Sequence, residues 1–178
     1  MAAEAGPGIR DEQTVTSDGR PTTPVIDGVV LRTPTVHLDH RGAVYEVYNG
    51  DPDLWSEPVV YAYVFTVRPG QMKGWGMHEH KEDRYSLIVG EGLVLLHDDR
   101  RDSPTRGVTQ SVVLAERGTR QLLIPRGVWH LHYNPTPHEA HFLNLPTEPY
   151  HHDAPDRLTL PWDTDQLSVD VSKYLPQR

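Results

Sequence analysis

The sequence predicts an all-β domain built as a barrel or a sandwich. From about residue 25, short segments rich in β-branched and aromatic residues follow one another, and turn-forming Gly and Pro residues separate them. No segment carries the sustained 3.6-residue apolar period of a long helix. The predicted strands are 29–33, 43–49, 59–67, 84–89, 92–97, 111–115, 120–125, 128–134 and 138–145.

The length of 178 residues suits one domain, and no internal repeat divides the chain. Residues 1–24 combine Gly, Pro, Ser, Thr and charged side chains without apolar periodicity, which predicts a disordered or loosely packed tail. A single domain is expected over residues 25–178. From about residue 150 we expect an irregular strap, with a short strand near Leu167–Val171, that packs over the barrel or a partner subunit.

Charge and composition narrow the class of protein. The net charge is -8, with 25 acidic and 17 basic residues, which argues against a nucleic-acid-binding surface. We expect no membrane segment, because no apolar run is long enough, and a cytoplasmic location, because the start lacks the pattern of a signal peptide. Cysteine is absent, so any metal must be held by imidazole and carboxylate groups, which directs attention to the 11 histidines.

Two histidine segments stand out. His78 and His80 are two residues apart, and in a strand both side chains would point into the barrel. Glu82 and Asp83 follow, and either carboxylate could complete a ligand set. A lone His-x-His is more often a polar strand face, but His130, directly after a Pro-x-Gly turn, favours a metal or catalytic pocket. His132 shares a face with His130.

These segments resemble the two signature motifs of the cupin superfamily, one built on His-x-His and the other on Pro-x-Gly, a histidine and an asparagine. The resemblance implies a cupin barrel, that is, a double-stranded β-helix or jelly roll. It also implies that His78, His80 and His130 bind a divalent metal ion such as Zn, Fe, Mn, Ni or Cu, with Asp83 or Glu82 as a further ligand.

From roughly Asp39 to Asp170 the chain is similar to the dTDP-4-dehydrorhamnose 3,5-epimerase family. The likeness rests on Asp39–Gly42 with Glu46, Lys73–Trp75, Gly90–Gly92, Asp99–Thr105, Arg120–Pro125, Gly127, His130, Tyr150, Pro155 and Trp162. That family uses a histidine base steadied by an aspartate, a lysine near the enolate oxygen and a tyrosine acid. Here the lysine and tyrosine positions hold Asp83 and Asn144, and the aspartate position falls at or beside Asp163 and Thr164.

The resemblance therefore implies a metal-dependent enzyme that enolises a nucleotide-linked 4-keto sugar or a similar keto compound, leading to epimerisation or isomerisation. The metal would replace the lost lysine as the Lewis acid. The catalytic candidates are His78, His132 and Tyr133, with Tyr85 as a further acid–base candidate. The substrate-binding candidates are Trp75, Arg84, Tyr85 and Asn144, and Arg84, Arg120 or Arg126 could meet a diphosphate.

Two other functions share these residues. An iron-dependent dioxygenase or lyase would use the same ligands, and a sugar-binding cupin without turnover would use the same pocket. No organic cofactor is expected. The family resemblance also implies a homodimer, with the strands near Val29–Val36 at the interface.

Overall fold

The structure is a computed structural model that describes residues 13–19, 22 and 24–175. The predicted N-terminal tail, residues 1–24, lies largely outside the described residues. Ile26 and Val29 are already buried in the core of the domain.

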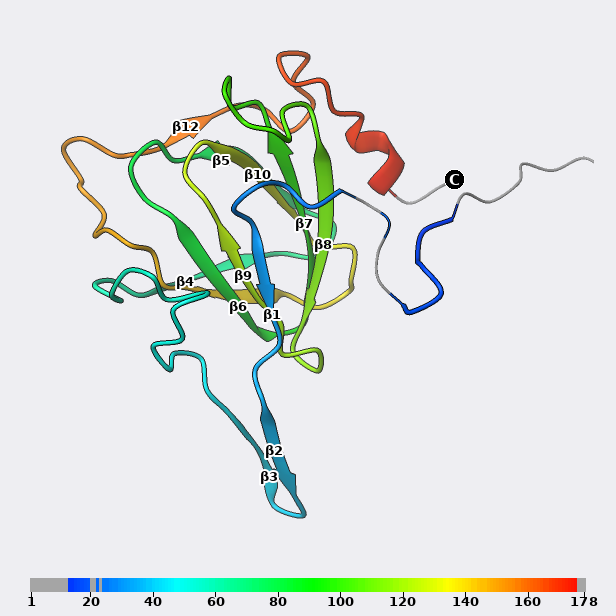
Figure 1. Ribbon diagram of the computed structural model, residues 1–178, viewed down its shortest axis with the longest axis vertical. Coiled ribbons are helices and arrows are strands. Elements are labelled where there is room, and N and C mark those ends of the chain that lie inside the picture. The colour runs from blue at the N-terminus through cyan, green and yellow to red at the C-terminus, as the bar shows by residue number, and fades with distance from the viewer. Residues whose placement is uncertain (1–12, 20–21, 23, 176–178) are drawn as a thin grey trace, which may run out of the picture.

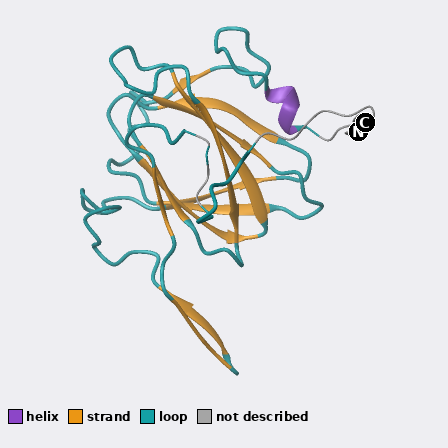
Figure 2. Ribbon diagram, turned by 45° about the vertical axis from the view of Figure 1, so that its right-hand side comes forward, coloured by secondary structure: helices purple, strands orange, loops and turns teal. Residues whose placement is uncertain are grey.

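Two five-stranded antiparallel sheets face each other and enclose the interior (Figure 1). This confirms the predicted all-β class. The first sheet runs in the order β1 (Val30–Arg32), β9 (Gln121–Ile124), β6 (Asp83–Val89), β11 (Ala140–Asn144), β4 (Tyr63–Val67). The second runs in the order β12 (Leu158–Thr159), β5 (Met72–Met77), β10 (Val128–Tyr133), β7 (Glu91–Asp98), β8 (Thr109–Ala115). A separate hairpin, β2 (Val36–Asp39) and β3 (Gly42–Tyr45), projects away from the body (Figures 1 and 2).

Strand alternation sorts the apolar residues into separate clusters. On β7, Val94 and Leu96 point between the sheets, whereas Leu95 points to the outer face. The outer cluster of the second sheet lies beneath the C-terminal strap, whose Leu167 and Val171 pack into it. The side-chain direction along each strand therefore decides which residues reach the interior.

The C-terminal strap differs from the prediction. The strand expected at Leu167–Val171 is wrong, because a four-residue 3-10 helix begins at Val171, with the Asp170 carboxylate accepting a bond from the Ser172 amide. Instead, β12 pairs with β5 earlier in the strap. Within the described residues, no helix is long and apolar enough to cross a membrane.

The run around Arg100, which carries part of the family resemblance, has a structural role. The buried carboxylate of Asp98 accepts hydrogen bonds from Arg100 Nε at 2.9 Å, Ser103 Oγ at 2.5 Å and Thr105 Oγ1 at 2.7 Å. Burial alone would raise the pKa of Asp98, but these bonds hold it well below its usual range. The run therefore fixes the turn between β7 and β8, outside the pocket.

Candidate functional site

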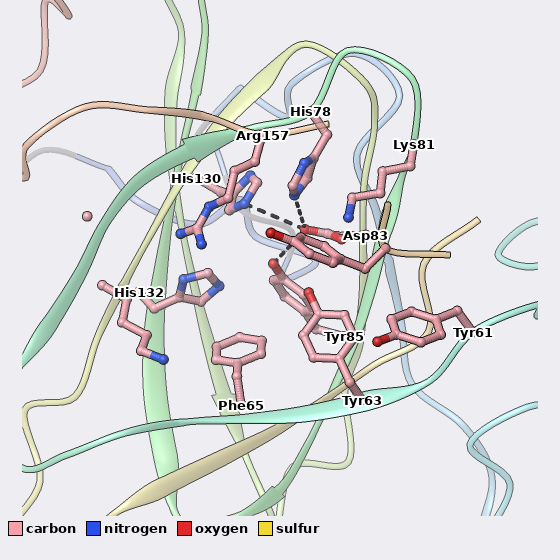
Figure 3. A pocket seen from close by; sticks show the side chains of 13 residues that line it. Tyr61, Tyr63, Phe65, His78, Lys81, Asp83, Tyr85, His130, His132 and Arg157 are labelled. Atoms are coloured by element: carbon pink, nitrogen blue, oxygen red, sulfur yellow. Dashed lines mark hydrogen bonds and ion pairs between the residues drawn. The ribbon is translucent and has the colours of Figure 1, made fainter. Parts of the chain in front are cut away.

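A cavity of about 270 Å³ lies between the two sheets, next to the end of β5. One wall comes from β4 and β6, the other from β5 and β10, and the strap closes a third side. Aromatic rings and positively charged side chains share the lining. The lining residues are Tyr61, Tyr63, Phe65, Lys73, Gly74, His78, Lys81, Asp83, Tyr85, His130, His132, Tyr150 and Arg157 (Figure 3).

Asp83 is the centre of the polar group in this cavity. Its Oδ2 lies 3.3 Å from His78 Nε2 and 3.5 Å from His130 Nε2, and all three residues are buried. The same oxygen accepts a hydrogen bond from the Tyr85 hydroxyl at 2.8 Å, and Oδ1 accepts one from the Asn144 amide at 2.7 Å. Two imidazoles and one carboxylate, distant in sequence, therefore meet in the pocket.

Backbone carbonyls determine where the imidazole protons lie. His78 Nδ1 bonds to the carbonyl of Asp156, and His130 Nδ1 lies 3.2 Å from the carbonyl of Val128. A carbonyl can only accept, so in the neutral rings each Nδ1 carries the hydrogen. Both Nε2 lone pairs then face Asp83, and the group gains stability by taking up a proton or a cation.

Burial and charge set the protonation states around Asp83. Burial alone would raise the pKa of Asp83, but the hydrogen bond and positive charge that His78 supplies once it carries a second proton, together with the bond from Asn144, lower it well below its usual range. Burial lowers the pKa of His130 to about 4, against the opposing charge of Asp83. At neutral pH Asp83 is ionised and His130 is neutral.

A bulge in β5 decides which of its residues enter the cavity. His130 pairs with Gly76 and His132 pairs with Lys73, so Gly74 and Trp75 together stand opposite a single residue of β10. Lys73 consequently lines the pocket, whereas Trp75 is buried in the outer cluster. The prediction that Trp75 contacts substrate is not supported by this placement.

The expectation that His78 and His80 point into the same interior is wrong. β5 ends at Met77, so His78 already lies past the strand and His80 lies in the bend that follows, where side chains do not alternate as in a strand. His80 is exposed and groups with Glu79 and Asp156, apart from the group around Asp83. Glu82 is also outside that group, because its Oε1 binds Arg126 Nη1 at 3.0 Å.

Two further predicted residues face away from the cavity. Arg84 follows Asp83 on β6 and therefore points to the opposite face, where it donates to the carbonyls of Glu57, Pro58 and Leu145. Tyr133 neighbours His132 on β10 and is buried in the outer cluster by the same alternation. Neither side chain lines the pocket, so neither is placed to contact a substrate there.

The remaining predicted residues lie in or directly behind the cavity. Tyr85 lines it, with its hydroxyl committed to Asp83. His132 also lines it and packs edge-on against Phe65, with the ring centroids 4.8 Å apart. Burial, then the neighbouring His130, lowers the pKa of His132 well below its ordinary value, so the ring is neutral. Asn144 stands behind Asp83 and anchors it.

Three cationic side chains in the cavity were not predicted. Lys73, Lys81 and Arg157 line it together with the histidines. Lys81 is 5% exposed, and within the described residues its ammonium has no ion pair, although it lies 5.9 Å from the centre of the Tyr150 ring. An unpaired buried cation is costly in a protein that binds nothing there, so Lys81 points to an anionic ligand.

Asp156 is a further residue that the sequence did not indicate. Its carbonyl holds His78, and its carboxylate accepts bonds from the backbone amides of Glu79, His80 and Lys81. Asp163, which lies at or beside the family's aspartate position, is exposed. The strap thus orients His78 through a main-chain group, which no side-chain motif can reveal.

Two facing antiparallel sheets with a polar pocket between them define the chain as a cupin. The family model for dTDP-4-dehydrorhamnose 3,5-epimerase matches residues 23–178. The chain therefore belongs to the dTDP-4-dehydrorhamnose 3,5-epimerase family and is an enzyme of the sugar-epimerase type.

Similar proteins agree with this assignment. The spore coat polysaccharide biosynthesis protein SpsL of Bacillus subtilis is 32% identical over 146 residues, which cover 82% of this chain and 96% of SpsL. The probable low-salt glycan biosynthesis epimerase Agl13 of Haloferax volcanii is 30% identical over 148 residues, covering 83% and 95%. The crystal structure of a dTDP sugar isomerase from Desulfovibrio desulfuricans has a TM-score of 0.75 at 24% identity, covering 83% of this chain and 92% of that one.

A second solved structure carries a ligand. The dTDP-6-deoxy-D-glucose-3,5-epimerase of Legionella pneumophila, in complex with dTDP-4-keto-L-rhamnose, has a TM-score of 0.72 at 24% identity, and the match covers 83% of this chain and 80% of that one. These structural matches establish the cupin fold that the two histidine motifs predicted.

Proposed function

We propose that this enzyme epimerises a nucleotide-linked 4-keto sugar by removing a proton from a carbon beside the carbonyl. The observation that carries the proposal is the His78–Asp83 pair, whose imidazole is oriented by the Asp156 carbonyl and opens into a cavity lined by cations. The similar Legionella enzyme, which binds dTDP-4-keto-L-rhamnose, supports this class of substrate.

His78 is the base in this proposal. The Asp156 carbonyl holds the hydrogen on Nδ1, so Nε2, which lies beside Asp83 at the edge of the cavity, is the nitrogen that accepts a proton from the substrate. The carboxylate of Asp83, 3.3 Å away, then stabilises the imidazolium that forms. Burial of both groups strengthens this attraction relative to water.

Lys81 compensates for the carboxylate that Asp83 brings to the family's lysine position. The enolate carries negative charge, which Asp83 alone would oppose. In Figure 3 the Lys81 side chain reaches into the cavity beside Asp83, only two positions earlier in the sequence. We assign Lys81 to the enolate oxygen, and Lys73 and Arg157 to the remaining negative charge of the substrate.

A divalent metal ion at His78, Asp83 and His130 is a second candidate for the centre. The donor set fits, because two nitrogen atoms and one carboxylate oxygen lie within 4.8 Å of one another with lone pairs facing inward. A bound ion would polarise the substrate carbonyl, and with iron the same residues suit the dioxygenase or lyase hypothesis.

We favour the metal-free centre because a positively charged side chain already lies near the candidate ligands. A methyl group built on Gly76 would lie 3.2 Å from His130 Nε2 and 3.6 Å from Arg157 Nε, so the Arg157 guanidinium already lies near one of the three donors. Metal ligation would also occupy the His78 lone pair that the base needs.

Deuterium exchange tests both candidates. Purified enzyme is incubated with dTDP-4-keto-6-deoxyglucose in deuterium oxide, and proton NMR follows label beside the carbonyl and formation of the epimer. We expect exchange and epimer formation that persist after treatment with a chelator. Activity that disappears with the chelator and returns with one added metal would establish the metal centre instead, and no exchange under any condition would refute the epimerase.

We further propose a homodimer, with the β2–β3 hairpin as the contact. Leu38 is 78% exposed and Val44 is 69% exposed on this hairpin. Apolar side chains that are this exposed to water indicate a surface that a partner covers. Strand β1, in the region expected at the interface, pairs with β9 of its own chain.

Sedimentation should give a mass of twice the 20.2 kDa of one chain. Leu38→Asp should shift the measured mass toward that of one chain. A wild-type mass of one chain would refute the dimer.

A further inference from the structure

The side-chain amide of Asn144 uses its oxygen and both of its hydrogens in hydrogen bonds. Its Oδ1 accepts from the backbone amide of Arg84 at 3.0 Å, which fixes the orientation of the side chain, because a backbone amide can only donate. Its Nδ2 then donates one hydrogen to Asp83 Oδ1 at 2.7 Å and the other to the Tyr63 hydroxyl oxygen at 2.9 Å. The Tyr63 oxygen is thus held as an acceptor, and its own hydrogen is left to point elsewhere.

The other tyrosines are less suited to give a proton. The Tyr85 hydroxyl already donates to Asp83. Tyr61 and Tyr150 line the cavity, but within the described residues no hydrogen bond holds either hydroxyl in place, and Tyr150 is 41% exposed. Among the pocket tyrosines of the described chain, Tyr63 combines a fixed oxygen with an uncommitted hydrogen.

Tyr63 and His78 approach the cavity from opposite walls. Tyr63 lies on β4, at the edge of the first sheet, whereas His78 directly follows β5 of the second sheet. In Figure 3 the Tyr63 ring rises from the wall facing His78, with Asp83 between them. A sugar ring in the cavity would have the His78 imidazole on one face and the Tyr63 hydroxyl on the other, as inversion at a carbon atom requires.

We propose that Tyr63 is the catalytic acid of the epimerisation and that Asn144, on the neighbouring strand, positions its hydroxyl group. Asn144 and Tyr63 are direct partners in the β11–β4 ladder, so the tyrosine absent from position 144 is replaced by one across the ladder. The inference rests on the proposed function.

The proton balance of this step is complete. His78 Nε2 takes the proton as the carbon–hydrogen bond breaks, and the electron pair moves to the carbonyl oxygen as an enolate. The Tyr63 hydroxyl gives its proton to the opposite face of the same carbon, and the carbonyl re-forms. The tyrosinate then takes a proton from water, and the imidazolium returns one to water.

The surroundings keep Tyr63 protonated until that step. Burial, then the charge of Asp83, raises the pKa of Tyr63 to about 12, while the bond from Asn144 acts in the opposite direction. The hydroxyl is therefore a proton donor at neutral pH. The amide of Asn144 stabilises the tyrosinate formed in the reaction.

The test separates proton removal from proton return. Tyr63→Phe removes one oxygen atom and leaves the base intact. With dTDP-4-keto-6-deoxyglucose in deuterium oxide, we expect epimer formation to fall about 100-fold, while exchange beside the carbonyl stays within about tenfold of wild type. His78 can still remove a proton and return a deuteron on its own face.

Tyr48→Phe is the matched control, since it makes the same chemical change at a half-exposed ring outside the cavity, and both rates should match wild type. Thermal unfolding confirms that each variant is folded. Epimer formation by Tyr63→Phe at the wild-type rate, or an equal loss of exchange and epimer formation, would overturn the role of Tyr63 alone. Absence of exchange in the wild type would instead remove the proposed function itself.

Discussion

Replacing His78 with asparagine is expected to reduce both deuterium exchange and epimer formation at least 1,000-fold, an estimate on the order expected for loss of a general base. The two other imidazoles that line the cavity are weak bases. Burial lowers the pKa of His130 to about 4, and burial together with the neighbouring His130 lowers the pKa of His132 well below its ordinary value. Proton NMR of both reactions measures the effect.

His138→Asn is the control for this substitution, because His138 is exposed in the loop before β11. Its rates should equal those of the wild type. If His78→Asn keeps more than about a tenth of the exchange rate, another group removes the proton and the assignment of the base is wrong.

Replacing Lys81 with methionine is expected to lower kcat about 100-fold and to change KM much less. The ammonium is needed when the enolate charge develops beside Asp83, and loss of one such group costs roughly 100- to 1,000-fold in rate. Methionine preserves the length and the apolar stem of the buried side chain. Steady-state kinetics give kcat and KM separately.

Lys173→Met, at an exposed position in the C-terminal helix, serves as the matched control and should leave both constants unchanged. A rise in KM with an unchanged kcat would contradict the role at the enolate. That result would place Lys81 at a group whose charge is constant during the reaction, such as the diphosphate.

Sequence reasoning succeeded where strand alternation and motif spacing were sufficient. The Pro-x-Gly turn placed His130 at the pocket, and the position of Asp83 at the start of β6 brought its carboxylate to the same point. The prediction that Arg84 contacts the substrate was wrong. Arg84 is next to Asp83 on β6, and neighbouring residues on a strand cannot share a face.

Other errors came from irregular backbone. The prediction for His80 assumed that the strand continues past Met77, where β5 ends. The prediction for Trp75 assumed a regular β5, whereas the strand contains a bulge. The contribution of Arg157 and Asp156 depends on a strap that returns to β5 about 80 residues later in the chain. No local pattern encodes such a return, because it results from packing over the outer cluster.

Asp156 makes the chemistry of the pocket depend on the strap that follows the barrel strands. Until that segment docks, the imidazole of His78 has no carbonyl to set its tautomer, and the bend that carries Lys81 lacks its cap. A chain whose strap is detached would keep the other strands of both sheets and still lack the carbonyl that orients its base. Catalytic competence would therefore be acquired only when the strap closes.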